Sequence, residues 1–371
     1  MQEQRLMNRV CWTPLALAPF ALALGMSTAH AQGNPCDPSN YGAVGDGMFG
    51  TGNGTDNTNA ITSGTDNTNA IQAAINACAT AGGGTVPLRV VNGQGVYVTG
   101  PIKLASHVLL QINKGVTLAA TNDQSRYVPA FINWVYQPNE ALISAANAID
   151  VGIIGSGTID GGGGATPPGG PPSSSWWTQA ATFAVHNTGP TNSYGVAYYI
   201  DPPDVPTSNG MPRPFLLEFY QCDNVIINGV TLQNAPMWHQ GLRFSHNITE
   251  TGMTVNTPGD SPNTDGVDVV GSTNVTLTNL NLSDGDDDIA IKSGLPVNPN
   301  SQDQMGIPQM ATSDVIVTNI TAGNGHGISV GRRRRTASTT SLFRTLATAA
   351  RRMASGSRRG ATAATRSMIS T

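Results

Sequence analysis

The sequence predicts an all-β protein, a parallel β-helix whose N-terminal end is covered by a short helix. Short runs of β-branched residues recur along the chain, and each is bounded by Asn, Asp or Gly. Three runs align closely, beginning at Asn224, Asn274 and Asp314, and their starts are 50 and then 40 residues apart. We interpret each interval as two turns of a coil of about 20–25 residues. Strand–turn–strand units at this period, with no helices between them, are typical of a parallel β-helix.

The expected strands place Val, Ile and Leu inward, where they would form one continuous core. The alternative fold, a β-sandwich, would need more frequent hairpin turns and a stricter alternation of polar and apolar residues. The strands expected in the β-helix are Val108–Ile112, Val151–Ile154, Val225–Leu232, Val275–Leu282 and Val315–Ile320.

One helix is expected before the strands begin. Apolar residues recur at helical spacing from Ala70 to Cys78, Asn67 or Thr68 is placed to cap the helix, and Gly82-Gly83-Gly84 ends it. We expect this helix to cover the open end of the stack, where backbone groups would otherwise lack partners.

Two segments read as loops. Gly54–Ile61 recurs without change at Gly64–Ile71, which we interpret as a recent duplication in a surface loop, where insertions are tolerated. Residues 161–175 are rich in Gly, Pro and Ser. We expect them to connect coils, not domains, because the strand pattern resumes on both sides.

Residues 1–31 are typical of a secretory signal peptide. Arg5 and Arg9 supply a basic start, and the apolar run Leu15–Leu24 is too short to span a membrane. Small residues favour cleavage after Ala31, so we expect a protein that is secreted or periplasmic. A signal anchor is the alternative.

Three cysteines remain after cleavage, at positions 36, 78 and 222. They are too few for a disulfide scaffold. An oxidising compartment allows one bridge, for which Cys36–Cys78 is the candidate pair, and leaves one thiol free.

The net charge of −4 combines two unlike segments. Residues 332–371 hold ten arginines and no acidic residue, whereas residues 1–331 hold 9 basic and 23 acidic residues. Only 11% of the residues are charged, which excludes a coiled coil. A basic tail on an acidic body usually indicates binding to nucleic acid or to an anionic surface.

Polar residues with catalytic potential are densest in three short motifs. These are Asn263-Thr264-Asp265-Gly266, Gly285-Asp286-Asp287-Asp288 and Gly325-His326-Gly327. Asp265 and Asp286 are 21 residues apart, about one coil, and His326 follows Asp287 by 39 residues, which we interpret as two coils. Because residues one coil apart lie about 4.8 Å apart, we expect all four side chains on one face.

Such crowding suits acid–base chemistry. Neighbouring carboxylates repel each other's charge, so at least one should keep its proton above the ordinary pKa. Glycoside hydrolysis uses this division, with one acid for the leaving oxygen and one base for water. A Ca²⁺ site is the second functional interpretation, since clustered carboxylates suit hard cations.

The remaining acidic residues and histidines are given structural interpretations. We expect Asp268, Asp284 and Asp288 to be turn residues or solvated. The other histidines are expected to be structural or exposed, with His239, beside Trp238, a candidate for a groove edge. They are His107, His186, His239 and His246.

At these residues the sequence resembles the polygalacturonase family of glycoside hydrolases, the pectin-degrading enzymes of family 28. The three motifs occur in the family's order, and the resemblance covers about residues 40–331. Further matching segments are Ile289-Ala290-Ile291-Lys292-Ser293-Gly294, Ile328-Ser329-Val330-Gly331, Tyr41-Gly42-Ala43-Val44-Gly45-Asp46-Gly47, Gly157-Thr158-Ile159-Asp160-Gly161 and Trp176-Trp177.

The resemblance implies a right-handed parallel β-helix over residues 32–331 and inverting hydrolysis of α-1,4-linked galacturonan. It implies that Asp286 is the general acid, and that Asp265 and Asp287 position and deprotonate the water. His326 would tune or orient the acid. The remaining implied site residues, on the substrate side, are Asn263 and Lys292. The partner would be a pectic polysaccharide, bound by a monomer without metal or cofactor, and neither nucleic acid nor membrane is expected.

The family's fourth motif, Arg-Ile-Lys, is absent after Gly331, where the strand pattern stops. We interpret residues 332–371 as translated out of frame. Permitted codons chosen for Met353–Thr371 and read two bases later give Gly-Phe-Arg-Ile-Lys, which restores the motif. Since that motif binds the substrate carboxylate in the family, we expect the chain as written to be inactive or nearly so, and poorly stable.

Other functions stay open. A pectate lyase shares the β-helix but uses Ca²⁺ and an arginine base. The further alternatives are a non-catalytic carbohydrate-binding β-helix and a nucleic-acid binder that uses the basic tail. Among hydrolases, the sequence does not choose between polygalacturonan, rhamnogalacturonan and xylogalacturonan, or between endo and exo cleavage.

Overall fold

The computed structural model describes most of the region in which strands were expected. The described residues are 33–49, 61–128, 139, 141–167, 170–182, 211, 213–293, 311–332 and 344–345. Most of the first copy of the duplicated segment, the leader 1–31, His186 and most of the basic tail lie outside them. No helix of the described part is both long enough and apolar enough to cross a membrane.

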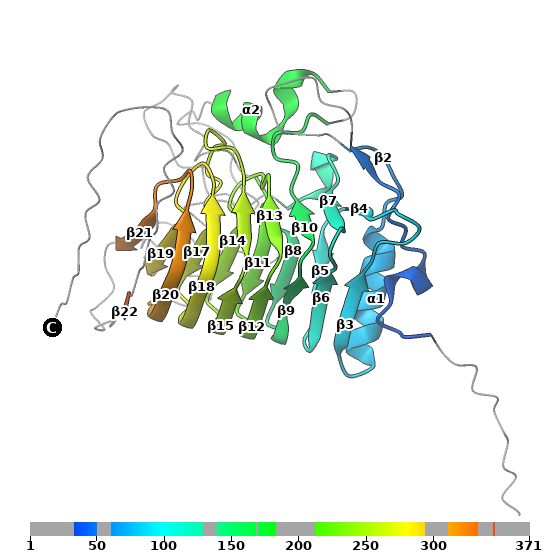
Figure 1. Ribbon diagram of the computed structural model, residues 1–371, viewed down its shortest axis with the longest axis horizontal. Helices are drawn as coiled ribbons and strands as arrows, with labels where there is room; N and C mark the ends of the chain where they lie inside the picture. Colours follow the sequence, from blue (N-terminus) through cyan, green and yellow to red (C-terminus); the bar gives the residue numbers. More distant parts are fainter. Residues whose placement is uncertain are drawn as a thin grey trace, which may run out of the picture. The chain divides into compact units, whose positions relative to one another are not determined.

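Strands stack in three parallel columns, which form a right-handed parallel β-helix (Figure 1). The first column is β3 (Gly84–Leu88), β6 (Val108–Ile112), β9 (Ile149–Gly155), β12 (Asp223–Asn228), β15 (His246–Thr251), the first halves of β18 (Thr273–Ser283) and β20 (Ser313–Ala322), and β22 (Arg344–Thr345). The second is β4 (Val96–Thr99), β7 (Thr117–Ala120), β10 (Thr158–Asp160), β13 (Thr231–Gln233), β16 (Thr254–Asn256) and the second halves of β18 and β20. The third is β5 (Ile102–Lys103), β8 (Ala141–Ala146), β11 (Phe215–Tyr220), β14 (Gln240–Arg243), β17 (Val267–Val270), β19 (Ile289–Ser293) and β21 (Ile328–Arg332).

The remaining elements are short. An antiparallel pair joins β1 (Met48–Phe49) to β2 (Ile61–Ser63), and three 3₁₀ helices and two α-helices complete the described chain. The helices are η1 (Pro38–Tyr41), α1 (Thr68–Thr80), η2 (Gln124–Arg126), η3 (Pro172–Ser174) and α2 (Trp176–Thr182). The segment 161–175 connects β10 to α2 between two coils, as expected.

The register confirms the expected strands and corrects one interval. Val225 pairs with Ile248, which pairs with Val275, so the first interval of 50 residues is two coils. Val275 pairs directly with Val315, so the interval of 40 residues is one coil and not two. The prediction was wrong because this coil contains a long insertion, residues 294–310, that the period could not reveal. A short strand, β22, also pairs with β20 after the point where the sequence pattern stops.

Asparagines begin several of the coils. Asn224, Asn247 and Asn274 have φ between 54° and 56°, a left-handed conformation that Asn tolerates better than most residues. Their side chains also bond from coil to coil: Asn247 Nδ2 donates to Asp223 Oδ1 at 2.7 Å, and Asn274 Nδ2 donates to Asn247 Oδ1 at 2.6 Å. This ladder explains why Asn bounds so many of the β-branched runs.

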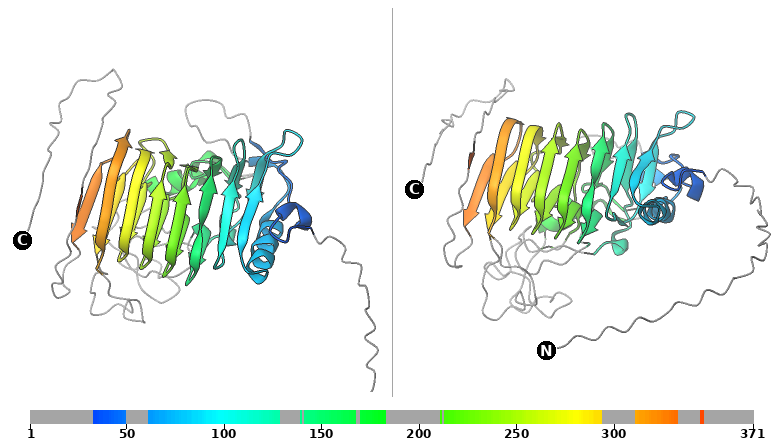
Figure 2. Two further views of the ribbon diagram at one scale, coloured as in Figure 1. Left: turned by 60° about the horizontal axis from the view of Figure 1, so that its bottom comes forward. Right: turned by 90° about the horizontal axis from the view of Figure 1, so that it is seen from below.

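The N-terminal helix covers the first coil, as expected (Figures 1 and 2). Ile71, Ala74, Ile75 and Cys78 on one face of α1 are buried, and Cys78 forms a disulfide with Cys36. Of the described cysteines, only Cys222 is free, and it is buried.

The expected helix cap is wrong in detail. Asn67 occupies the capping position without capping, because its side chain bonds the backbone of Val44 and Val98. Asp66 Oδ1 instead accepts the Thr68 N–H at 3.0 Å.

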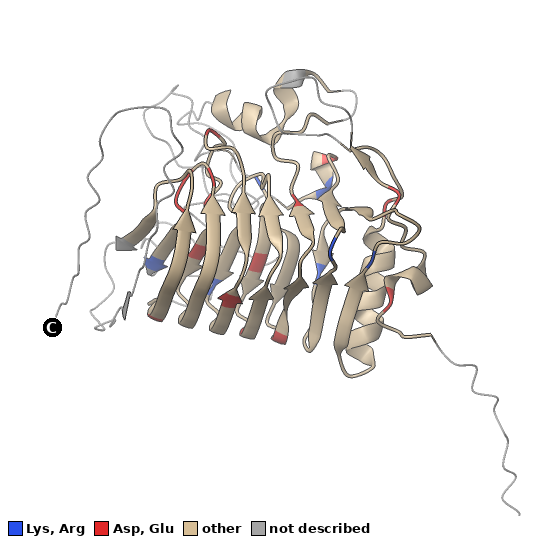
Figure 3. Cartoon of the chain, viewed as in Figure 1, with Lys and Arg blue, Asp and Glu red and all other residues tan. Residues whose placement is uncertain are grey.

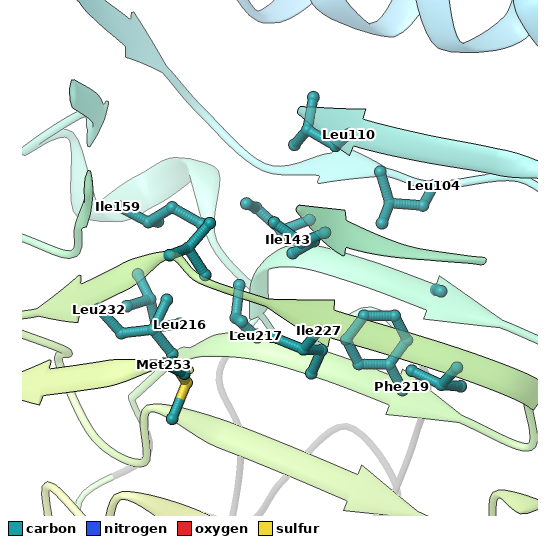
Figure 4. Packing of buried hydrophobic residues seen from close by; sticks show 14 of the residues in the cluster. Leu104, Leu110, Ile143, Ile159, Leu216, Leu217, Phe219, Ile227, Leu232 and Met253 are labelled. Atoms are coloured by element: carbon teal, nitrogen blue, oxygen red, sulfur yellow. The ribbon is translucent and has the colours of Figure 1, made fainter. Parts of the chain in front are cut away.

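Inward side chains of successive coils stack on one another to form the core (Figure 4). Each fully buried Leu or Ile contributes about 1.5–3 kcal/mol to folding. Along one line of the stack Leu110 faces Ile153, which faces Ile227. The next residue in that line is Glu250, followed by Leu277, so one carboxyl group interrupts an aliphatic stack.

Burial raises the pKa of Glu250 to about 7, and the Gln240 Nε2 that donates to it at 2.9 Å only partly offsets that rise. We expect stability to fall as pH rises from about 4.5 to about 7, because only the folded state keeps the Glu250 proton there, and then to level off. The loss is about 3 kcal/mol. Urea unfolding between pH 5 and pH 8 measures it, and Glu250→Gln should remove this part of the pH dependence. Identical pH slopes for the two proteins would contradict the prediction.

Candidate active site

The three polar motifs occupy equivalent turns on three successive coils. Each turn leads from the second column into the third, just before β17, β19 and β21. Gly266 N donates to Asp287 O at 2.9 Å, and His326 N donates to Asp286 O at 2.7 Å. Figure 3 shows acidic residues in the turns that follow β18 and its neighbours. His326 thus lies one coil from Asp287, not two, for the reason given above.

The predicted catalytic residues Asp286, Asp287 and His326 converge. One ligand atom from each of the three lies within 4.8 Å of the others. The carboxyl group of Asp286 is partly open to solvent, at 27% side-chain exposure, and His326 Nδ1 is 3.2 Å from its Oδ1. Asn263 Nδ2 donates to Asp286 Oδ2 at 3.1 Å. A solvent-accessible carboxyl held at both oxygens can exchange a proton with a bound molecule.

Asp287 has a partner that the sequence analysis did not assign. Ser329 Oγ, from β21 on the next coil, donates to Asp287 Oδ1 at 2.6 Å. That bond fixes the carboxylate and leaves its other oxygen available.

Asp265 lies deeper than the other two carboxyl groups, at 4% exposure. Burial, and then the charge of Asp268, raises its pKa well above its ordinary value, although Lys292 opposes the rise. The direction of this shift is the one expected for a buried carboxyl group close to other acids.

Lys292 is held among acidic and aromatic groups. Its Nζ bonds Asp268 Oδ1, lies 3.7 Å from Asp265 Oδ2 and sits 3.9 Å from the centre of the Trp238 ring. Trp238 stacks on Phe215 with ring centres 4.7 Å apart. The cation therefore balances two buried carboxyl groups, and its predicted role in substrate binding stays a prediction.

The expectation that three acids are solvated is wrong, although Asp284 and Asp288 do lie in a turn. Asp268, Asp284 and Asp288 are buried rather than solvated, with at most 2% of each residue exposed. Burial raises the pKa of Asp268 to about 7, and burial together with the charge of Asp288 raises that of Asp284 to about 8. Neighbouring glycines leave room for these carboxyl groups, since a Cβ at Gly266 would lie only 3.0 Å from Asp284 Oδ2.

Arg213 is the functional residue that the sequence analysis missed. It is fully buried ahead of β11, where its Nη1 donates to Pro236 O and Pro262 O. Its Nη2 donates to Asn263 Oδ1 at 2.8 Å, so the Asn263 amide must turn its Nδ2 toward Asp286. Burial lowers the pKa of Arg213 to about 9, against the charges of Asp265 and Asp286. The available signal was a lone Arg directly before an apolar strand.

The described histidines outside the motifs are structural or exposed, as expected. His239 is fully buried and not at a groove edge; burial lowers its pKa to about 4, so the ring is neutral. Its Nδ1 lies 3.1 Å from both Thr264 O and Asp265 O, and its Nε2 bonds Thr257. It therefore anchors the backbone of the Asp265 turn. His107 is exposed beside Asp150, and His246 bonds Thr273.

The sequence is similar to those of known polygalacturonases. The chain is 29% identical over 265 residues to an endo-polygalacturonase of Pectobacterium carotovorum subsp. carotovorum, covering 70% of this chain and 56% of that protein. It is 25% identical over 309 residues to a polygalacturonase of Malus domestica, covering 83% of this chain and 51% of that protein. The chain thus spans about half the length of these curated relatives.

Solved structures agree with the fold. The polygalacturonase from Erwinia carotovora ssp. carotovora superimposes with a TM-score of 0.57 at 26% identity, over 81% of this chain and 70% of that one. An exopolygalacturonase from Thermotoga maritima gives 0.56 at 23% identity, over 80% and 62%. The family model "Glycosyl hydrolases family 28" matches residues 83–341. The chain belongs to glycosyl hydrolases family 28.

Proposed function

We propose that the protein hydrolyses α-1,4-galacturonosidic bonds of polygalacturonate by an inverting acid–base mechanism. The observation that carries the acid–base chemistry is the convergence of Asp286, Asp287 and His326 within 4.8 Å, with Asp265 on the adjacent coil. The inverting outcome rests on the family resemblance and not on this distance. Relatives named polygalacturonases in bacteria and plants support the choice of substrate.

The contacts suggest how the roles divide. Asp286, open to solvent and held by Asn263 and His326, protonates the leaving oxygen. Asp287, fixed by Ser329, accepts the proton of the attacking water. Asp265, buried on the adjacent coil beside Lys292, positions that water.

Recognition of an anionic substrate needs cationic side chains that are not already paired with other groups of the protein. At the described site Arg213 binds backbone oxygens and Asn263, and Lys292 balances Asp265 and Asp268. This supports the proposal that the Arg-Ile-Lys motif, restored in the other reading frame, is needed for full activity.

Export and a monomeric state are part of the same proposal. The leader 1–31 and the Cys36–Cys78 disulfide support a secreted or periplasmic protein, because such bridges persist in oxidising compartments.

The products test the reaction class. With polygalacturonate, we expect saturated reducing ends, unchanged by a calcium chelator, from the frame-corrected chain and at most traces from the 371-residue chain. Unsaturated ends that depend on calcium would indicate a lyase and contradict hydrolysis. Full activity of the 371-residue chain would contradict the need for Arg-Ile-Lys.

Substitution tests the catalytic groups. In the frame-corrected chain, Asp265→Asn, Asp286→Asn and Asp287→Asn should each lower kcat by about 100-fold or more. The last two substitutions remove a proton-transfer group, and the first removes the carboxyl group that positions the water. Asp123→Asn is the matched control, since that exposed residue caps a turn far along the chain and Asn caps equally well. Near-normal turnover in all three variants would show that the assignment is wrong.

A further inference from the structure

A pair of buried carboxyl groups lies beneath the catalytic turns. Asp284 begins and Asp288 ends the turn between β18 and β19 that carries Asp286 and Asp287, and both are buried. A Cβ at Gly325 would lie 2.7 Å from Asp288 Oδ1 and 3.0 Å from Asp284 Oδ1. Both oxygens therefore face the same point, directly under the turn that carries His326.

Each carboxyl group accepts a backbone N–H from a catalytic turn. Asp286 N donates to Asp284 Oδ1 at 3.2 Å, and Gly327 N donates to Asp288 Oδ2 at 3.0 Å. The first bond shapes the turn of the general acid, and the second reaches the turn on the next coil. The pair thus links the main chain on both sides of the contact between Asp286 and His326.

We propose that Asp284 and Asp288 are positioning residues, which hold the Asp286 turn and the His326 turn at a fixed separation. This rests on the function proposed above. The pair replaces the water or side-chain hydroxyl groups that would otherwise satisfy the two part-buried N–H groups. Two adjacent carboxylates would repel each other, and burial, followed by the charge of Asp288, raises the pKa of Asp284 to about 8, which lessens that repulsion near neutral pH.

The surrounding glycines are consistent with such a pair. Gly325 has a φ of +129°, and any side chain there would collide with both carboxyl groups. A Cβ at Gly266, on the preceding coil, would lie 2.5 Å from Asp288 O and 3.0 Å from Asp284 Oδ2. The pair therefore lies between the glycines of two catalytic motifs and not in open solvent.

Hydrogen exchange of the 371-residue chain tests the proposal without any need for activity. In the unsubstituted protein, the amides of Asp286 and Gly327 should exchange as slowly as those of β19. In Asp284→Ala and Asp288→Ala, exchange should rise by about ten-fold or more in both turns, since a hydrogen bond of this kind is worth about that factor. Strand β12 should be unaffected. Fast exchange of either amide in the unsubstituted protein would overturn the proposal, even if an alanine variant failed to fold.

The conservative variant separates positioning from general stability. Asp284→Asn keeps the oxygen that accepts Asp286 N–H and offers an amide donor in place of the proton, so slow exchange should return. In the frame-corrected chain kcat should fall about ten-fold in Asp284→Ala, with KM little changed, and recover in Asp284→Asn. Asp260→Ala, an exposed residue in a nearby turn, is the control.

The outcomes separate this proposal from the proposed function. If the unsubstituted enzyme hydrolyses no polygalacturonate, the proposed function fails but the exchange data still decide on the pair. If Asp284→Ala leaves exchange in the His326 turn unchanged, or Asp284→Asn behaves like Asp284→Ala, the positioning role is wrong while hydrolysis stands.

Discussion

The parallel register between coils is the constraint on which the rest of the structure depends. Backbone hydrogen bonds fix each strand directly above its predecessor, so inward residues stack into one core and equivalent turns stack into one line. Asp265, Asp287 and His326 are distant in sequence but occupy that line on successive coils. The repeat of the fold therefore brings these three residues together without a separate structural element. A register shift of one residue would turn them to the other face of the coil.

Burial dominates the electrostatics of the site. Asp265, Asp268 and Asp284 lie where water does not solvate a charge, and in the described part of the chain Lys292 and Arg213 are the cations that act on this group. Lys292 serves two of these carboxyl groups, and Arg213 serves backbone oxygens and Asn263. Where no cation offsets the negative charge of a buried carboxyl group, protonation is favoured. Keeping the group neutral costs less free energy than burying its charge. The carboxyl group of Asp286, in contrast, is partly open to solvent.

Features that follow from a periodic pattern could be predicted from the sequence. Features that depend on how deeply a side chain is buried could not. The strands, the covering helix, the disulfide pair and the meeting of Asp286 with His326 follow from spacing and motif order. The coil count before His326 failed because an insertion changes length without changing register. Asp284 and Asp288 were expected to be solvated because an acidic residue in a turn usually points to water. The glycines on the coils above and below show that these two side chains are covered instead. No sequence pattern marks Arg213, because its partners are mostly backbone oxygens from other coils.

The glycines of the motifs gain a chemical reason from this arrangement. Gly266 and Gly325 belong to the turns that carry Asp265 and His326, and each closely approaches a carboxyl group of the Asp284–Asp288 turn. A side chain at either position would push neighbouring coils apart, and the distance between Asp286 and His326 would grow with it. Close approach of backbone to backbone is therefore a condition of the catalytic geometry, in addition to leaving room for a substrate. The sequence shows the glycines, but only the stacked turns show that what they accommodate is the enzyme's own buried acid.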